Sequence, residues 1–152
     1  MSAAQVLVVD DDEANALFIR DLAADWGYEA AVAHNAEQAL ALASGREFDL
    51  VVTDLRMPGA DGFQLIRELR ERQPLLAIVA ITAFGSTESG SRALEAGATA
   101  YLPKPFRPDV LEQRIRQALD RRLLRLKNER LRRDVEQLLR KSDDPRDRKP
   151  VK

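Results

Sequence analysis

Short apolar runs that end in a charged or polar residue constrain this chain more than any other feature. Such runs end at Asp10, Asp54, Thr82 and Lys104, and Asp11 follows Asp10 directly. Continuous apolar runs of this length are typical of strands buried on both faces, as in a parallel sheet covered by helices. Functional groups in such open sheets gather at the carboxyl ends of the strands. These side chains are therefore expected at one edge of a sheet.

Segments of helical period alternate with the apolar runs, which is typical of repeated βαβ units. The expected strands cover residues 5–9, 28–33, 48–53, 75–81 and 99–102. The expected helices cover residues 13–26, 35–45, 63–73, 87–96 and 109–141, and a turn covers residues 57–62. In the first helix, Leu17, Phe18, Leu22 and Trp26 are expected to face the core. The pattern predicts an α/β, flavodoxin-like, doubly wound five-stranded parallel sheet with strand order 2-1-3-4-5 and an extended C-terminal helix.

Composition excludes several classes of function. The chain has 152 residues and no cysteine, which rules out disulfides, thiolate metal sites and cysteine nucleophiles. The first residues show no charged stretch followed by an apolar one, so no secretory signal is expected. The longest apolar run, Leu75 to Ile81, is far shorter than the roughly 20 residues that a membrane helix needs. A cytoplasmic protein without a membrane partner is expected.

Charge divides the chain into two parts. Residues 1–120 hold 11 Lys/Arg and 19 Asp/Glu, a balance of −8, whereas residues 121–152 hold 13 Lys/Arg and 6 Asp/Glu, a balance of +7. Such asymmetry indicates a boundary. We expect one domain over residues 1–120, a basic helical extension over 121–141 and a disordered tail over 142–152.

The acidic residues suit a divalent cation. Asp10 and Asp11 could simply cap the next helix, but one carboxylate would suffice for that, and adjacent carboxylates repel unless a cation lies between them. Oxygen ligands, without cysteine and with His34 as the sole histidine, favour Mg²⁺, with Mn²⁺ as an alternative, over zinc. Asp54 would be a third ligand and a candidate nucleophile, since aspartate can form an aspartyl-phosphate intermediate.

The remaining polar residues suit a phosphoryl group. Lys104 could be a plain surface lysine, but proline on both sides fixes its backbone, and Lys104–Pro105 is a candidate for a cis peptide bond. A fixed lysine could neutralise phosphoryl oxygens opposite a metal ion. Thr82 alone is an ordinary strand-end residue, yet its hydroxyl could donate to a phosphoryl oxygen. Together these residues predict a site that holds a cation and a phosphoryl group.

Over roughly residues 4–120 the chain resembles the receiver domain of bacterial two-component response regulators, which has the CheY-like form of this fold. The matching segments are Val-Val-Asp-Asp at 8–11, Asp54 before Met-Pro-Gly-Ala-Asp-Gly, Thr82-Ala83, Gly97-Ala98, and Tyr101 before Lys104-Pro105-Phe106. Local segments such as Asp-Leu-Arg-Met-Pro-Gly and Tyr-Leu-Pro-Lys-Pro-Phe are most similar to receivers of the nitrogen-regulation (NtrC) type.

The resemblance implies a role for each acidic residue. Asp54 is the phosphoacceptor, and its donor is a sensor histidine kinase or a phosphotransfer protein. Asp10 and Asp11 hold Mg²⁺ together with Asp54 and the backbone carbonyl of Arg56. The domain implied is a signalling domain rather than an enzyme.

The resemblance also implies how the phosphoryl group is held and read. Lys104 contacts it, and Thr82 and Tyr101 form the switch pair. Receivers tune the attack of water through the residues two positions after the phosphoacceptor and two after the threonine, here Arg56 and Phe84. Because neither side chain can position a water as a base would, only slow autodephosphorylation is expected.

The basic extension carries a heptad pattern. Leu124, Leu131 and Leu138 are seven residues apart, and Asn128 and Val135 occupy the intervening seam positions. This spacing favours a parallel coiled-coil homodimer, with the buried asparagine fixing the register. An arginine in the first seam position and like charges facing each other across the seam oppose it. The alternatives are a solvated helix and a helix that binds nucleic acid, which is disfavoured because no recognition motif or interleaved aromatic residue accompanies the arginines.

Two other functions are compatible with the sequence. The chain could be the N-terminal fragment of a sigma-54-type DNA-binding transcriptional activator, which would need further domains. It could also be a phosphatase with an aspartyl-phosphate intermediate. Such enzymes usually carry a second acid two residues after the nucleophile, where this chain has Arg56.

Overall fold

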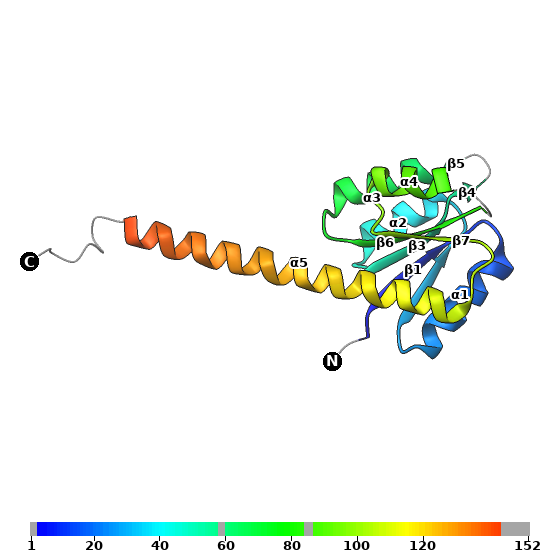
Figure 1. Cartoon of the computed structure of the whole chain (residues 1–152), viewed down its shortest axis with the longest axis horizontal. Helices are drawn as coiled ribbons and strands as arrows, with labels where there is room; N and C mark the ends of the chain where they lie inside the picture. The colour runs from blue at the N-terminus through cyan, green and yellow to red at the C-terminus, as the bar shows by residue number, and fades with distance from the viewer. Residues whose placement is uncertain (1–2, 58–59, 84–86, 144–152) are drawn as a thin grey trace, which may run out of the picture.

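A parallel sheet of five strands forms the centre of the chain, with helices on both of its faces (Figure 1). The computed structural model describes residues 3–57, 60–83 and 87–143. The sheet strands are β1 (Gln5–Val9), β2 (Glu29–Ala33), β3 (Leu50–Asp54), β6 (Ala77–Thr82) and β7 (Ala100–Pro103). The helices are α1 (Glu13–Asp25), α2 (Ala36–Gly45), α3 (Gly62–Arg72), α4 (Thr87–Ala96) and α5 (Pro108–Asp143). The order β2-β1-β3-β6-β7 confirms the predicted order 2-1-3-4-5 and the predicted fold class.

The sheet separates two apolar cores. One core lies between the sheet and the pair α1 and α5, and the other lies between the sheet and α2, α3 and α4. Side chains alternate between the two along each strand: in β1, Val6 and Val8 face α1 and α5, whereas Leu7 and Val9 face the other layer. Burial on both faces explains why the strands read as continuous apolar runs rather than as alternating ones.

Polar residues and glycines define the ends of several helices. Asp12, Asn35 and Asp61 are N-caps of α1, α2 and α3, and each side chain accepts a hydrogen bond from a backbone N–H in the first turn. Gly27 follows α1 with φ +93°, and Gly97 follows α4 with φ +123°. Only glycine adopts such left-handed backbone angles without strain, so these residues end the helices where the sequence predicts.

The prediction for the inner face of α1 was partly wrong. Phe18 is 51% exposed, whereas Ala16 and Ile19 are buried. Leu22 and Trp26 pack at the margin of the core as partly buried residues. Because Ala16 is small, α1 can lie close to the sheet at this residue. The buried side of α1 is therefore not the side with the largest apolar side chains.

The expected turn over residues 57–62 overlaps a short antiparallel pair, β4 (Arg56–Met57) and β5 (Ala60–Asp61), which the sequence did not predict. The chain then enters α3 at Gly62, which is buried. A Cβ atom at Gly62 would lie 2.7 Å from both the Cα and the carbonyl oxygen of Leu55, closer than a real side chain can approach. Glycine is required here because α3 begins against the backbone that follows Asp54.

The last helix begins on the sheet and then leaves it. Leu111, Ile115 and Ala118 of α5 are buried, and Arg122 forms an ion pair with Asp49 at 3.1 Å. Beyond this contact α5 extends away from the other elements (Figure 1). Neither α5 nor any other helix in the described parts of the chain combines the length and apolarity needed to cross a membrane.

The burial of α5 predicts a contrast between two leucines of the same helix. Leu111→Ala should lower the free energy of unfolding by about 2–5 kcal/mol, because it removes a fully buried side chain and leaves a cavity. Leu123→Ala should change it by less than about 0.5 kcal/mol, because Leu123 is already exposed. Urea unfolding followed by circular dichroism measures both. Equal losses would contradict the packing of α5 on the sheet.

Candidate functional site

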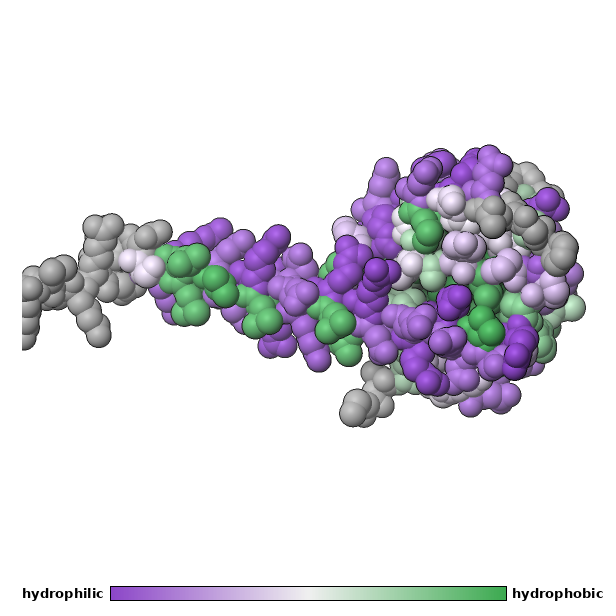
Figure 2. Space-filling view, in the orientation of Figure 1, coloured by the Kyte–Doolittle hydropathy of each residue, from purple (hydrophilic) through white to green (hydrophobic). Residues whose placement is uncertain are grey.

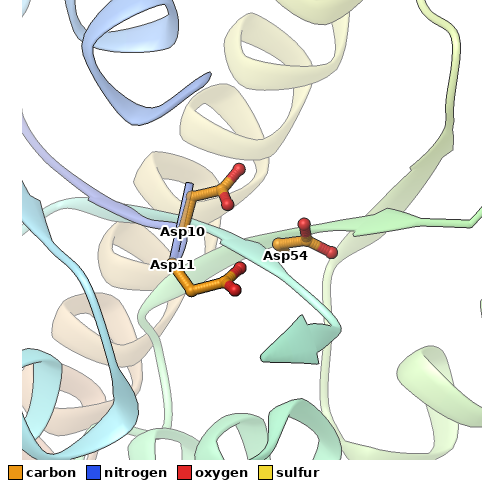
Figure 3. Close-up of side chains that lie close together, drawn as sticks. All are labelled: Asp10, Asp11 and Asp54. Atoms are coloured by element: carbon orange, nitrogen blue, oxygen red, sulfur yellow. The ribbon is translucent and has the colours of Figure 1, made fainter. Parts of the chain in front are cut away.

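Three carboxylates meet at the carboxyl edge of the sheet. Asp54 is the last residue of β3, and Asp10 and Asp11 directly follow the neighbouring strand β1. One carboxylate oxygen from each residue lies within 4.8 Å of the others. Figure 3 shows the three side chains close together. Asp10 is 1% exposed and Asp54 is 7% exposed, whereas Asp11 is open to solvent. The predicted acidic cluster is therefore present.

Hydrogen bonds hold the two buried carboxylates in place. The backbone N–H of Asp12 donates to Asp10 Oδ1 at 2.9 Å, and the backbone N–H of Arg56 donates to Asp54 Oδ1 at 3.0 Å. The ammonium group of Lys104 donates to Asp54 Oδ2 at 2.8 Å. Asp54 thus lies close to both the acidic pair and the lysine.

Lys104 reaches the site from the segment that follows β7. Its backbone N–H donates to the carbonyl oxygen of Thr82 at 3.0 Å, and the Lys104–Pro105 bond is cis as the sequence suggested. Burial alone would lower the pKa of Lys104. The hydrogen bond and charge of Asp54, with the charges of Asp10 and Asp11, outweigh burial and raise that pKa above its usual value. Lys104 is therefore a fixed positive charge at neutral pH.

Two buried oxygen atoms of the site have no partner among the described residues. They are Asp10 Oδ2 and the hydroxyl oxygen of Thr82. Burial raises the pKa of Asp10, the Asp12 N–H offsets part of this rise, and the nearby Asp54 carboxylate adds to it. A buried carboxylate oxygen without a donor is costly in an apolar environment. A cation between the carboxylates would remove that cost, so the oxygen-only donor set fits Mg²⁺.

Thr82 and Tyr101, the expected switch pair, lie on neighbouring strands. Thr82 ends β6 and is fully buried, and Tyr101 lies in β7 opposite Ala80. Alternation along β6 places Ala80 and Thr82 on the side of the sheet covered by α3 and α4, where Tyr101 packs as well. The structure thus brings both residues to one face, although only Thr82 is at the edge that holds the carboxylates.

An apolar cleft beside the site was not found by the sequence analysis. It has a volume of about 400 Å³ and is lined by Asp10, Asn15, Phe18, Ile19, Lys104, Pro105 and Phe106. The signal available in the sequence was Phe18, which was assigned to the core. Of the two residues expected to tune the attack of water, Arg56 is exposed next to Asp54 and Phe84 lies outside the described residues.

Comparison with known proteins agrees with this fold and site. Residues 6–116 match the family model of the response regulator receiver domain. The chain belongs to this family and is a receiver domain of response regulators. It is 40% identical over 114 residues to the transcriptional regulatory protein ZraR of Salmonella typhimurium, a match that covers 75% of this chain and 26% of ZraR. It is 41% identical over 120 residues to protein PetR of Rhodobacter capsulatus, covering 79% of this chain and 50% of PetR.

Solved structures show the same likeness. NtrX from Brucella abortus, in complex with ATP, superposes with a TM-score of 0.82 at 32% identity, covering 85% of this chain and 30% of NtrX. A CheY-like receiver domain protein from Methanospirillum hungatei superposes with a TM-score of 0.77 at 30% identity, covering 82% of this chain and 99% of that one. The likeness to NtrX agrees with the expected nitrogen-regulation type. The chain spans about a quarter of the length of ZraR.

Because three carboxylates lie close together, we expect the site to destabilise the folded protein when no cation is bound. Asp10→Asn should raise the thermal midpoint of unfolding in EDTA, because it removes a buried charge that faces Asp54 and keeps an acceptor for the Asp12 N–H. Asp21→Asn, at an exposed position of α1, should change stability by less than about 0.5 kcal/mol. Calorimetry at neutral pH compares the two. A lower midpoint for Asp10→Asn would contradict this account of the site.

Proposed function

We propose that Asp54 accepts a phosphoryl group from a phosphohistidine of a partner kinase or phosphotransfer protein. The observation that carries this proposal is that Asp54 lies close both to the acidic pair Asp10 and Asp11 and to the ammonium group of Lys104. A carboxylate in that position can act as a nucleophile while the charges around it balance those of the incoming group.

The proposed transfer makes one bond and breaks one. An oxygen of the Asp54 carboxylate forms a bond to phosphorus, and the phosphorus–nitrogen bond of the donor histidine breaks. The electron pair of the broken bond stays on the imidazole nitrogen, which takes up a proton. Lys104 now contacts Asp54 Oδ2 at 2.8 Å and would exchange that contact for a phosphoryl oxygen. Thr82, whose buried hydroxyl lacks a partner among the described residues, would donate to another.

The cation proposed for this site is Mg²⁺, with Mn²⁺ as an alternative. The carboxylates of Asp10, Asp11 and Asp54 would hold it, and the resemblance adds the backbone carbonyl of Arg56, whose N–H lies beside Asp54. When bound, such an ion supplies positive charge that offsets the phosphoryl oxygens. The residues themselves fix the acceptor oxygen and shield it from water, since Asp10 and Asp54 are both buried.

Phosphorylation of Asp54 can be tested with a small donor. In acetyl phosphate and Mg²⁺ the intact mass of the protein should rise by one phosphoryl group, and Asp54→Asn should show no rise. In EDTA the labelling should fall by at least about tenfold, because the carboxylates then repel the incoming anion. The label should persist after the donor is removed, because Arg56 cannot activate a water as a base.

Two results would overturn the assignment. One is equal labelling of the wild type and Asp54→Asn, and the other is full labelling in EDTA. Asp49→Asn is a suitable control, because Asp49 lies at the opposite end of β3 and pairs with Arg122.

The surface for the phosphodonor is proposed to be the cleft beside the site. Asp54 is almost fully buried, so a donor histidine must be carried by a protein that fits closely over this edge of the sheet. The cleft runs from Asp10 and Lys104 to exposed Phe18, and Phe106 lines it as well. Its apolar residues offer a contact surface next to the reacting atoms.

The proposed output is a shift between two conformations. Thr82 would move toward the phosphoryl group, and the ring of Tyr101 would move into the space that Thr82 leaves. Both residues lie on the face of the sheet that α3 and α4 cover, so the change would be read at α4, β7 and α5. The extent of the shift is set by the difference in phosphoryl affinity between the two conformations.

A homodimer through α5 is also proposed. Leu124, Leu131, Val135 and Leu138 are each more than half exposed. They form an apolar stripe on the part of α5 that leaves the sheet, where Figure 2 shows hydrophobic side chains along the helix. Because successive residues turn by about 100°, this stripe lies roughly opposite the face that carries Leu111, Ile115 and Ala118. A second copy could therefore pack on the stripe without displacing the sheet.

Sedimentation equilibrium tests the dimer. The wild type should be dimeric at high micromolar concentration, and Leu131→Lys with Leu138→Lys should be monomeric, because two charges would enter the seam. Leu123→Lys, on the same helix but away from the stripe, should stay dimeric. The proposal would be contradicted if the wild type were monomeric both with and without a phosphoryl mimic.

We also propose that this receiver is part of a cytoplasmic regulator of transcription. The supporting observation is the match to ZraR, whose name describes a transcriptional regulatory protein, and of which this chain spans about a quarter. In such an arrangement the receiver takes the signal and another part of the protein binds DNA. A phosphatase is not favoured, because Arg56 occupies the position where those enzymes usually carry a second acid.

A further inference from the structure

The ring of Tyr101 rests against a helix at the one residue of that helix that has no side chain. Gly90 lies inside α4 and is buried against β7. A Cβ atom at Gly90 would lie 2.5 Å from Cε2 of Tyr101 and 2.7 Å from both Cδ2 and Cζ. Real Cβ atoms do not come so close to an aromatic ring. The ring can occupy its observed position only because residue 90 is glycine.

Contacts with α3 and with the core oppose a movement of α4 away from the Tyr101 ring. Ala93, one turn after Gly90, is fully buried in the core beneath α4. The guanidinium group of Arg92 lies over the ring of Phe63 on α3, with 4.2 Å between its carbon and the ring centroid. These contacts hold α4 on both α3 and the sheet. A side chain at residue 90 would therefore displace the ring of Tyr101 more easily than it would displace the helix.

Helix formation gives no reason for glycine at this position. Glycine in a helix interior is less stable than alanine, because it loses more backbone freedom on folding. The α-helical residues on both sides of Gly90 show that the helix passes through it without a break. Close approach of a ring is thus the physical reason that the structure offers for glycine here.

We propose that Gly90 is a positioning residue that sets the position of the Tyr101 ring in the unphosphorylated protein. Gly90 thereby influences the equilibrium between the two conformations of the phosphorylation-dependent switch. This inference rests on the proposed function, because Tyr101 matters to signalling only if it responds to Thr82. A side chain at residue 90 moves the ring away from α4 before any phosphoryl group is bound. The conformation with the ring on α4 then loses population, and the response to phosphorylation changes.

A double-mutant cycle on the unphosphorylated full chain tests the contact. Gly90→Ala should raise the urea midpoint in a Tyr101→Ala background, where alanine favours the helix and meets no ring. In the wild-type background it should lower the midpoint or raise it less, because the ring must move. Gly45→Ala is the matched control, because Gly45 ends α2 and nothing lies within 4 Å of its Cβ position. The change in urea midpoint caused by Gly45→Ala should be equal in both backgrounds.

Aromatic NMR signals of Tyr101 report the ring position directly. Gly90→Ala should shift these signals in the unphosphorylated protein, and Gly45→Ala should leave them in place. The further change on adding acetyl phosphate and Mg²⁺ should differ between Gly90→Ala and wild type at equal occupancy of Asp54, which intact mass measures.

Equal midpoint shifts for Gly90→Ala in both backgrounds, or unmoved Tyr101 signals, would overturn the inference. An identical response to phosphorylation in Gly90→Ala and wild type would overturn its link to the switch. These outcomes are distinct from a failure of the proposed function, which would appear as absent labelling of wild-type Asp54. The stability cycle does not depend on that labelling.

Discussion

The contact between Asp54 and Lys104 joins the two halves of the site, and much of the molecule serves to make it. Three carboxylates converge where β1 and β3 end, and their mutual repulsion needs a positive charge nearby. Lys104 supplies that charge at 2.8 Å from a segment 50 residues further along the chain. The parallel order of β1, β3, β6 and β7 is what brings these residues to one edge, because parallel strands all end on the same side.

The same crowding explains how the site could act as a switch. Asp10 Oδ2 and the Thr82 hydroxyl are buried without hydrogen-bond partners among the described residues. A cation and a phosphoryl group would supply the missing partners, and the gain would be available only in a conformation that lets Thr82 reach them.

From this edge the structure offers a continuous route toward α5. Thr82 and Tyr101 lie on one face of adjacent strands, and Tyr101 lies against Gly90 of α4. β7, which carries Tyr101, is followed by the segment of Lys104 and then by α5. The apolar stripe of α5 begins where the helix leaves the sheet, so the proposed change at β7 would reach the stripe through α5. This arrangement suits a receiver that signals to whatever lies on or beyond α5.

The order of the five strands, the helix ends and the acidic cluster could all be predicted from the sequence. Those predictions succeeded because buried parallel strands are continuous apolar runs, and because the acidic residues follow those runs directly in the chain. The resemblance to receivers, confirmed by the family match over residues 6–116, added the roles of Asp54, Thr82, Tyr101 and Lys104 as proposals.

Which apolar residues are buried, and which small residues are indispensable, depends on how the helices pack on the sheet. Phe18 looked like a core residue but lies beside the site, because the buried side of α1 is set by the distance between helix and sheet and favours Ala16. Gly90 gives space to the Tyr101 ring, and Gly62 gives space to the backbone of Leu55. The spacing of apolar residues in the sequence indicates which side of a helix or strand is apolar. It does not indicate how closely two elements approach, because that distance depends on the packing of the whole chain.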